Sequence, residues 1–196
     1  MSKFGKFWLK IISFILIVCW AFISAFFIFD FVERNFLYPI KYEQEIINYS
    51  DKYGLDRALV FAMVRVESSF NLNAKSEKGA VGLMQITSQT AEYIANLTGV
   101  NEYNLTSAKD NLNFGCYYIK YLINRFGILD TALCAYNAGE GNVSKWLDDK
   151  NYSDGDGNLT KIPFKETESY VKKVNDNIEI YKKLYYKNNE GVTENE

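Results

Sequence analysis

The chain has 196 residues, with 22 basic and 24 acidic side chains, and it contains no histidine. This length predicts one domain with an appendage. The lack of histidine excludes Ser-His and Cys-His catalysis and zinc sites built on imidazole. Acid-base chemistry therefore falls on Asp, Glu, Lys, Tyr or Cys. There are only two prolines, which favours long, uninterrupted helices, so the fold class we expect is mostly α.

The N-terminal segment has the pattern of a membrane anchor. Residues 1–10 are basic and contain no acid, and residues 11–29 contain no charged side chain. An apolar run of this length predicts a single transmembrane helix. Lys3, Lys6 and Lys10 before it predict a cytoplasmic N-terminus, with the rest of the chain on the extracytoplasmic, cell-wall side.

A cleaved signal peptide is the alternative for this segment. Ser24 and Ala25 offer the small residues that cleavage needs, but the apolar run continues past them to Phe29. The length of the run therefore favours an uncleaved anchor. Residues 30–38 are expected to be a juxtamembrane linker.

Residues 39–186 are expected to form one helical domain, and residues 187–196 a disordered tail. Helix-start signals occur at Pro39, at Asp56, at Thr87 or Ser88, and at Asp130. Glycines that can end helices are Gly54, Gly99 and Gly127. Apolar periodicity predicts further helices at 111–126, 131–137 and 143–147, and a long last helix with Tyr170, Val174, Ile178, Tyr181 and Tyr185 along one face.

Charge and cysteine content limit the kinds of partner. Without residues 1–30 the chain is net acidic, which argues against nucleic-acid binding through overall charge. Cys116 and Cys134 fall in two predicted helices. An oxidising location would permit a disulfide between them, although two small buried side chains are the interpretation that we favour.

A stretch of acidic and glycine residues at 154–158 begins like a calcium loop. Leu159 stands where such a loop requires glycine, and Lys165 stands where it requires the closing glutamate. The sequence therefore predicts a polar turn here, and no metal site.

Glu67 is the candidate for catalytic chemistry. Leu59, Met63 and Val66 recur at helical spacing and predict a buried face, and Glu67 lies at the edge of that face. A carboxyl held against apolar packing is poorly solvated, which raises its pKa. A carboxyl that stays protonated near neutral pH can act as a general acid. The alternative is an ordinary half-exposed glutamate near a helix end.

The chain contains three separated motifs. The first lies within 67–91 and includes Glu67-Ser68-Ser69-Phe70 and Gly82-Leu83-Met84-Gln85, the second is Ala135-Tyr136-Asn137-Ala138-Gly139, and the third is Pro163-Phe164-Lys165-Glu166-Thr167. In this order they resemble the catalytic domain of the soluble lytic transglycosylases, which are lysozyme-like enzymes that cleave bacterial peptidoglycan. The resemblance extends from about Tyr42 to about Tyr185 and implies a lysozyme-like α-helical domain. Thr87 and Glu140 depart from the family pattern, which usually has Met and Pro there, and this leaves the substrate preference open.

The resemblance implies a mechanism with one catalytic residue and no cofactor. Glu67 would protonate the glycosidic oxygen between N-acetylmuramic acid and N-acetylglucosamine. It would then take a proton from the C6 hydroxyl, which closes a 1,6-anhydro ring. A lysozyme-type hydrolase of the same fold and a non-catalytic wall-binding scaffold are the alternatives.

The resemblance also implies the substrate-binding residues. We expect Tyr136 to lie beside Glu67 and to donate a hydrogen bond to its carboxylate. The expected partners are the glycan strands of peptidoglycan and, through residues 11–29, the membrane. The implied substrate-binding set is Ser76, Met84, Gln85, Tyr136, Asn137 and Glu166.

Overall fold

The structure is a computed structural model that describes residues 3–186. The expected tail at 187–196 lies outside the described residues. The chain divides into two compact units, Met1–Ile40 and Lys41–Glu196. Each unit is described by itself.

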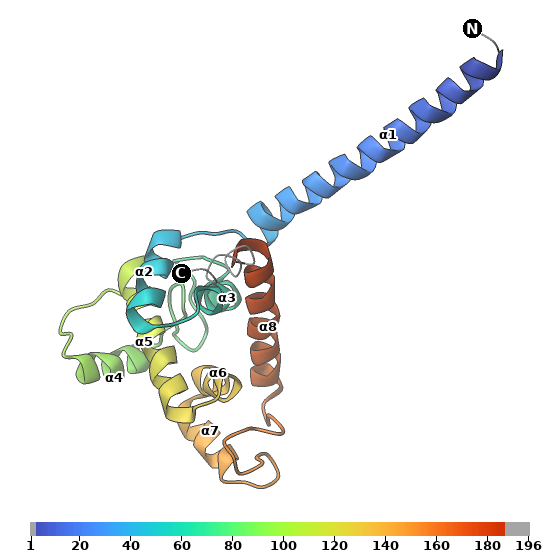
Figure 1. Ribbon diagram of the computed structural model, residues 1–196. Helices are drawn as coiled ribbons and strands as arrows, with labels where there is room; N and C mark the ends of the chain where they lie inside the picture. The colour runs from blue at the N-terminus through green and yellow to red at the C-terminus, as the bar shows by residue number, and fades with distance from the viewer. Residues whose placement is uncertain (1–2, 187–196) are drawn as a thin grey trace, which may run out of the picture. The chain divides into compact units, whose positions relative to one another are not determined.

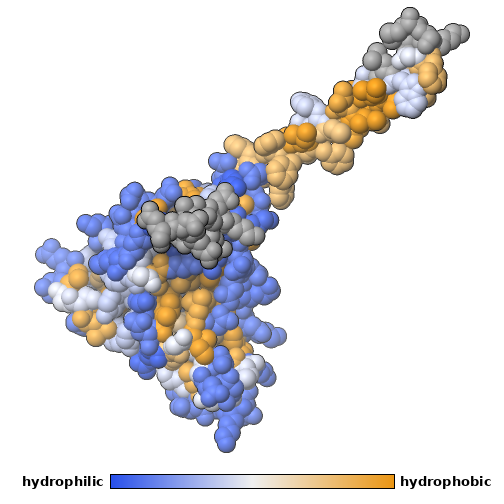
Figure 2. Space-filling view, in the orientation of Figure 1, coloured by the Kyte–Doolittle hydropathy of each residue, from blue (hydrophilic) through white to orange (hydrophobic). Residues whose placement is uncertain are grey.

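The first unit is a single long helix with a turn at its end. Helix α1 (Lys3–Val32) is followed by the π-helical turn η1 (Glu33–Leu37). Large apolar side chains such as Phe14, Trp20 and Phe22 are exposed along α1. Figure 2 shows hydrophobic surface along much of this helix. The stretch Lys10–Leu37 is long and apolar enough to cross a membrane, a test that anchors and signal sequences both pass.

The second unit confirms the expected mostly α fold (Figure 1). Within the described residues, β structure is limited to isolated bridges, including two in the turn that follows α3. The helices are α2 (Glu43–Tyr53), α3 (Arg57–Ser68), α4 (Ser88–Thr98), α5 (Ala108–Phe126), α6 (Leu129–Ala138), α7 (Glu140–Leu147) and α8 (Lys165–Tyr181), with the π-helical turn η2 (Lys182–Tyr186) at the end.

Helix α3 is the core element of this unit. Its N-cap is Asp56, as predicted, and the Asp56 carboxylate accepts a hydrogen bond of 2.8 Å from Ala58 N. Every residue from 58 to 64 is buried, as expected for a helix that is apolar all round. Helix α3 ends with Glu67 and Ser68, so its rigid packing fixes the position of the Glu67 carboxyl.

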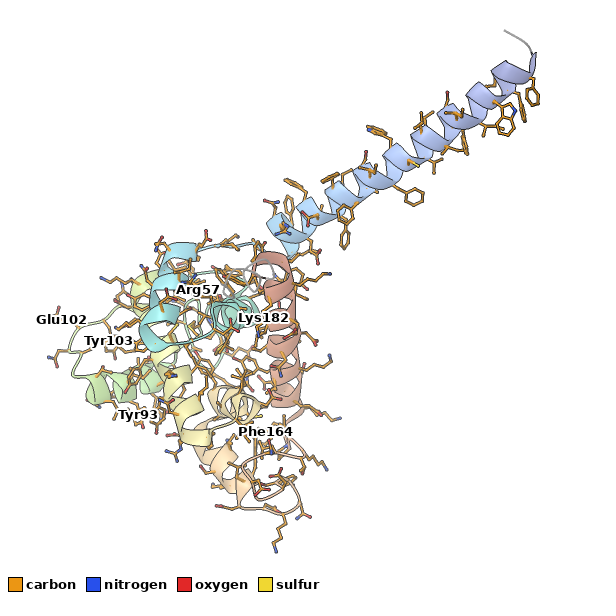
Figure 3. All side chains as sticks on the ribbon, viewed as in Figure 1. Arg57, Tyr93, Glu102, Tyr103, Phe164 and Lys182 are labelled. Carbon is orange, nitrogen blue, oxygen red and sulfur yellow. The ribbon has the colours of Figure 1, made fainter. Side chains whose placement is uncertain are left out.

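Helix α8 packs along α3. The rings of Phe61 and Tyr181 stack with their centroids 5.4 Å apart. Lys182 (labelled in Figure 3) forms an ion pair of 3.2 Å with Asp56, next to the start of α3. These contacts fix the last helix against the helix that carries Glu67, so the first turn of α8 can contribute to the same site.

Four helix starts differ from the sequence expectation, including that of α7, which begins at Glu140 and not at residue 143. Helix α2 begins at Glu43 and not at Pro39, because Tyr42 has a left-handed backbone (φ 54°) that interrupts the helix. Helix α5 begins three residues early, capped by the Ser107 hydroxyl. Asp130 lies in the first turn of α6 and does not cap it, since its carboxylate accepts a hydrogen bond from Asn175 of α8.

Two of the three cysteines are structural, whereas Cys19 is exposed on α1. Cys116 and Cys134 are both buried, and both thiols are free. Burial raises the pKa of each thiol, so neither is a reactive thiolate at neutral pH.

Candidate active site

The structure forms a cleft of about 190 Å³ at the end of α3. It is lined by the end of α3, the turn that follows it, the end of α6 and the start of α8. The cleft is lined by every candidate catalytic and substrate-binding residue that the sequence analysis named, except Met84. The lining residues are Glu67, Ser76, Lys78, Ala80, Gln85, Thr87, Tyr136, Asn137 and Glu166.

The buried side chain of Asn111 supports the turn that carries Gln85. It is fully buried, and its carboxamide oxygen accepts a hydrogen bond of 2.8 Å from Met84 N. Its amide nitrogen donates to the carbonyls of Val81 and Leu105, each at 2.9 Å. One side chain therefore satisfies three buried backbone groups, which fixes the floor of the cleft.

Glu67 has the properties of an acid that is protonated near neutral pH. Its carboxyl faces the cleft but is otherwise enclosed by protein. Desolvation raises its pKa to about 7, and the hydroxyl of Tyr170 opposes that rise. The Tyr170 hydroxyl is buried and its contact with Glu67 falls outside ordinary hydrogen-bond geometry, so desolvation dominates.

Tyr136 differs from the expectation in the partner of its hydroxyl. The hydroxyl donates a hydrogen bond of 2.8 Å to the carbonyl of Met84, so its proton is not available to Glu67. Tyr136 still lies near enough for the Glu67 charge to raise its pKa, although burial is the larger cause. The hydroxyl that lowers the pKa of Glu67 is that of Tyr170, from α8, and the hydroxyl of Tyr136 instead fixes the turn.

The two amide side chains in the cleft, Gln85 and Asn137, leave opposite hydrogen-bonding groups available. Gln85 Nε2 donates to the carbonyls of Ala74 (3.2 Å) and Gly82 (2.9 Å), which leaves Oε1 as an acceptor. Asn137 Oδ1 accepts a hydrogen bond of 2.8 Å from the Thr167 hydroxyl, which leaves Nδ2 as a donor. The cleft therefore presents one fixed acceptor and one fixed donor.

Met84 does not lie on the cleft surface. Its side chain is fully buried and packs against Gly115 of α5, where a β-carbon would overlap the thioether. The expectation that Met84 contacts substrate is therefore corrected to a packing role. Its backbone connects Asn111 and Tyr136, because the amide donates to one and the carbonyl accepts from the other.

Ser76 and Glu166 lie at the edge of the cleft. The Ser76 hydroxyl oxygen accepts a hydrogen bond of 3.0 Å from Ala80 N and keeps its own proton to donate. Glu166 Oε2 lies 3.6 Å from Lys78 Nζ. Among the residues that the structure describes, no group of three or more His, Cys, Asp or Glu side chains could hold a metal ion.

Sequence reasoning did not assign Lys78, Thr167 or Tyr170 to the site. Lys78 lies in a stretch with ordinary turn composition, and Tyr170 was assigned to the core face of the last helix. One signal was present, because Thr167 and Tyr170 are three residues apart and share a helix face with the motif that contains Glu166.

A helical domain with a desolvated acid in a polar cleft is the arrangement expected of the lytic transglycosylase class. The chain belongs to the transglycosylase SLT domain family, whose sequence model matches residues 44–159.

Known proteins of this class are similar over the same region. The soluble lytic murein transglycosylase of Escherichia coli K12 is 34% identical over 155 residues, which cover 75% of this chain and 23% of that protein. The membrane-bound lytic murein transglycosylase C of Serratia proteamaculans is 29% identical over 168 residues, covering 73% of this chain and 47% of that protein.

Solved structures agree with the fold. An inactive variant of the Pseudomonas aeruginosa lytic transglycosylase Slt, in which a glutamate is replaced by glutamine, superimposes with a TM-score of 0.67 at 31% identity. It covers 74% of this chain and 24% of that chain. This chain therefore spans about a quarter of the length of the soluble relatives.

Proposed function

We propose that this chain is a peptidoglycan lytic transglycosylase that cleaves the β-1,4 bond between N-acetylmuramic acid and N-acetylglucosamine. The observation that carries the proposal is Glu67, an acid with its pKa raised to about 7 in a polar cleft. An acid with this pKa is substantially protonated near neutral pH and can also serve as a base after it has given up its proton. The inactive glutamate-to-glutamine variant of the Pseudomonas relative supports an essential acid in this class.

The chemistry needs only one proton carrier. Glu67 gives its proton to the glycosidic oxygen as the bond to the C1 carbon of muramic acid breaks. The resulting carboxylate takes the proton of the C6 hydroxyl, and the C6 oxygen forms a new bond to C1. The product ends in a 1,6-anhydro ring, and Glu67 is again protonated. Catalysis of both steps by one group requires that its pKa lie near the working pH.

The two fixed amides fit the acetamido groups of this substrate. An acetamido group has one N–H donor and one carbonyl acceptor. Gln85 Oε1 is placed to accept, and Asn137 Nδ2 to donate, because their other atoms are engaged by protein groups. A site with prearranged polar partners distinguishes substrates with the matching groups from those without them.

We further propose that α1 anchors the chain in the membrane with the helical domain on the cell-wall side. Its apolar length and the lysines before residue 11 support this orientation. Protease added to spheroplasts should digest the domain and leave the anchor. Protection of the whole domain would contradict the orientation, and release of a shortened soluble domain would indicate a signal sequence.

Mass spectrometry of a muropeptide digest tests the proposed reaction. Purified cell wall is incubated with the chain and the soluble products are weighed. A transglycosylase yields anhydro-muramic ends, lighter by one water than the reducing ends that a lysozyme-type hydrolase releases. Reducing ends would overturn the proposed reaction, and binding to the wall without any soluble product would indicate a scaffold.

A further inference from the structure

Few charged groups line the cleft, and its carboxyl groups outnumber its cations. Its lining contains two carboxyl groups, Glu67 and Glu166, and one cation, Lys78, among the residues that the structure describes. Lys78 lies in the turn after α3, and Glu166 in the first turn of α8. The two therefore face one another across the edge of the cleft, from segments far apart in the chain.

The pair between Lys78 and Glu166 is a weak one. The N–O distance is 3.6 Å, and the two side chains are 82% and 75% exposed. This separation is longer than a good hydrogen bond, and exposed ion pairs contribute little to stability. Glu166 is also stabilised by the N-terminal end of α8 without Lys78. Lys78 can therefore exchange this partner for another carboxylate at little cost.

The substrate supplies such a carboxylate only at its side branches. A strand of alternating N-acetylglucosamine and N-acetylmuramic acid has an uncharged sugar backbone. Its ionised groups lie on the peptide stems, which are attached to the lactyl group of each muramic acid. A cation at the edge of a cleft that holds the sugars is thus in a position to contact the stem.

We propose that Lys78 is a binding site for a carboxylate of the peptide stem, and that it makes the cleft prefer anionic strands. This inference rests on the proposed function, because it takes peptidoglycan as the substrate class. When the stem carboxylate binds, it replaces Glu166 as the partner of Lys78. The reaction at Glu67 is unchanged, so the effect is on strand affinity.

The test measures strand binding to the full-length chain in non-ionic detergent, with Glu67→Gln as the parent so that nothing is cleaved. Two strand preparations are used, both with stem amines acetylated. One keeps its carboxylates, and the other has them converted to methylamides. Lys78→Met is compared with Lys75→Met, which removes the same charge from an exposed position of the same turn outside the cleft lining.

We expect Lys78→Met to weaken binding of the carboxylate strands by roughly two- to fivefold at low salt, and to leave binding of the methylamide strands unchanged. Raising the ionic strength should remove this difference, and Lys75→Met should change neither affinity. Equal effects on both strand preparations, or equal effects of the two substitutions, would overturn the role of Lys78 and leave the proposed function intact. Failure of the parent to bind either preparation would overturn both.

Discussion

The Thr167 hydroxyl donates a hydrogen bond of 2.8 Å to Asn137 Oδ1 and thereby fixes which end of that amide faces the cleft. Thr167 is fully buried, so solvent does not compete for the bond. The two residues come from α8 and α6, and their contact joins the second and third sequence motifs.

Replacing Thr167 by valine should therefore weaken substrate binding without removing the acid. The valine keeps the shape but cannot donate, so the Asn137 amide is free to turn. We expect the KM for glycan strands to rise by about threefold to tenfold, which corresponds to one net hydrogen bond. Thr167→Ser retains the hydroxyl and should restore the wild-type KM. A defect shared by the serine variant would show that the methyl group, and not the hydrogen bond, matters.

Tyr170→Phe should shift the pH dependence of activity. The Tyr170 hydroxyl stabilises the ionised form of Glu67 and so lowers its pKa. Removing the hydroxyl raises that pKa further, and because the protonated acid is the active form, the alkaline limb should move to higher pH by up to about one unit. The measurement is a pH series of muropeptide release.

Tyr136→Phe is the matched control for that shift. The Tyr136 hydroxyl donates to the Met84 carbonyl and not to Glu67. Its loss should lower the rate through the position of the turn and leave the alkaline limb in place. A limb that moved with Tyr136→Phe and stayed with Tyr170→Phe would reverse our assignment of the two hydroxyls.

The raised pKa of Glu67 also predicts how stability depends on pH. The carboxyl has a pKa of about 7 in the folded chain against an ordinary value of 4.5. Between these values the folded state holds a proton that the unfolded state has lost, so increasing pH favours unfolding. The contribution of this proton to the free energy of unfolding is complete below about pH 4.5 and is lost as the pH rises through 7. In total it is on the order of 3 kcal/mol.

The Glu67→Gln variant should not show this loss of stability with increasing pH, because glutamine does not titrate. The unfolding free energy of the variant minus that of wild type should increase between pH 4.5 and pH 8, as measured by denaturant titration in detergent. A difference that stays constant with pH would mean that the Glu67 carboxyl is solvated and that its pKa is ordinary.

Gly82→Ala should destabilise the chain more than Gly79→Ala. Both glycines have left-handed backbones, with φ of 81° and 80°, so each substitution costs about 1 to 2 kcal/mol of strain. A β-carbon at Gly82 would also overlap Asn111, whereas the space at Gly79 is open. We expect roughly 2 to 5 kcal/mol in total at Gly82. Equal thermal midpoints for the two variants would show that Asn111 can move aside.

Local sequence signals predicted the framework of the site. Asp56 was identified as one cap and either Thr87 or Ser88 as another, and Asp56 and Thr87 act as caps, because capping depends on residues only two or three positions away. The burial of Leu59 and Met63 in the helix that carries Glu67 was predicted for the same reason, since apolar periodicity is a local property, whereas Val66 is only half-buried.

Contacts between distant segments were not predictable in the same way. The bond of Tyr136 to the Met84 carbonyl depends on how α6 packs on the turn, and the donor beside Glu67 comes from α8, more than a hundred residues later. Met84 was assigned to the cleft by the family resemblance. The Met84 side chain instead packs in the core, in the space that Gly115 leaves by having no β-carbon. This contact is visible only in three dimensions.

The rate at which Glu67→Gln releases soluble muropeptides from purified wall tests the central claim most directly. The amide is close to the carboxyl in size but cannot transfer a proton, so the account predicts a folded chain that still binds wall and has lost nearly all activity. A variant that kept about a tenth or more of the wild-type rate would have lost no more than about one factor of ten. That result would contradict the account and show that another residue supplies the proton.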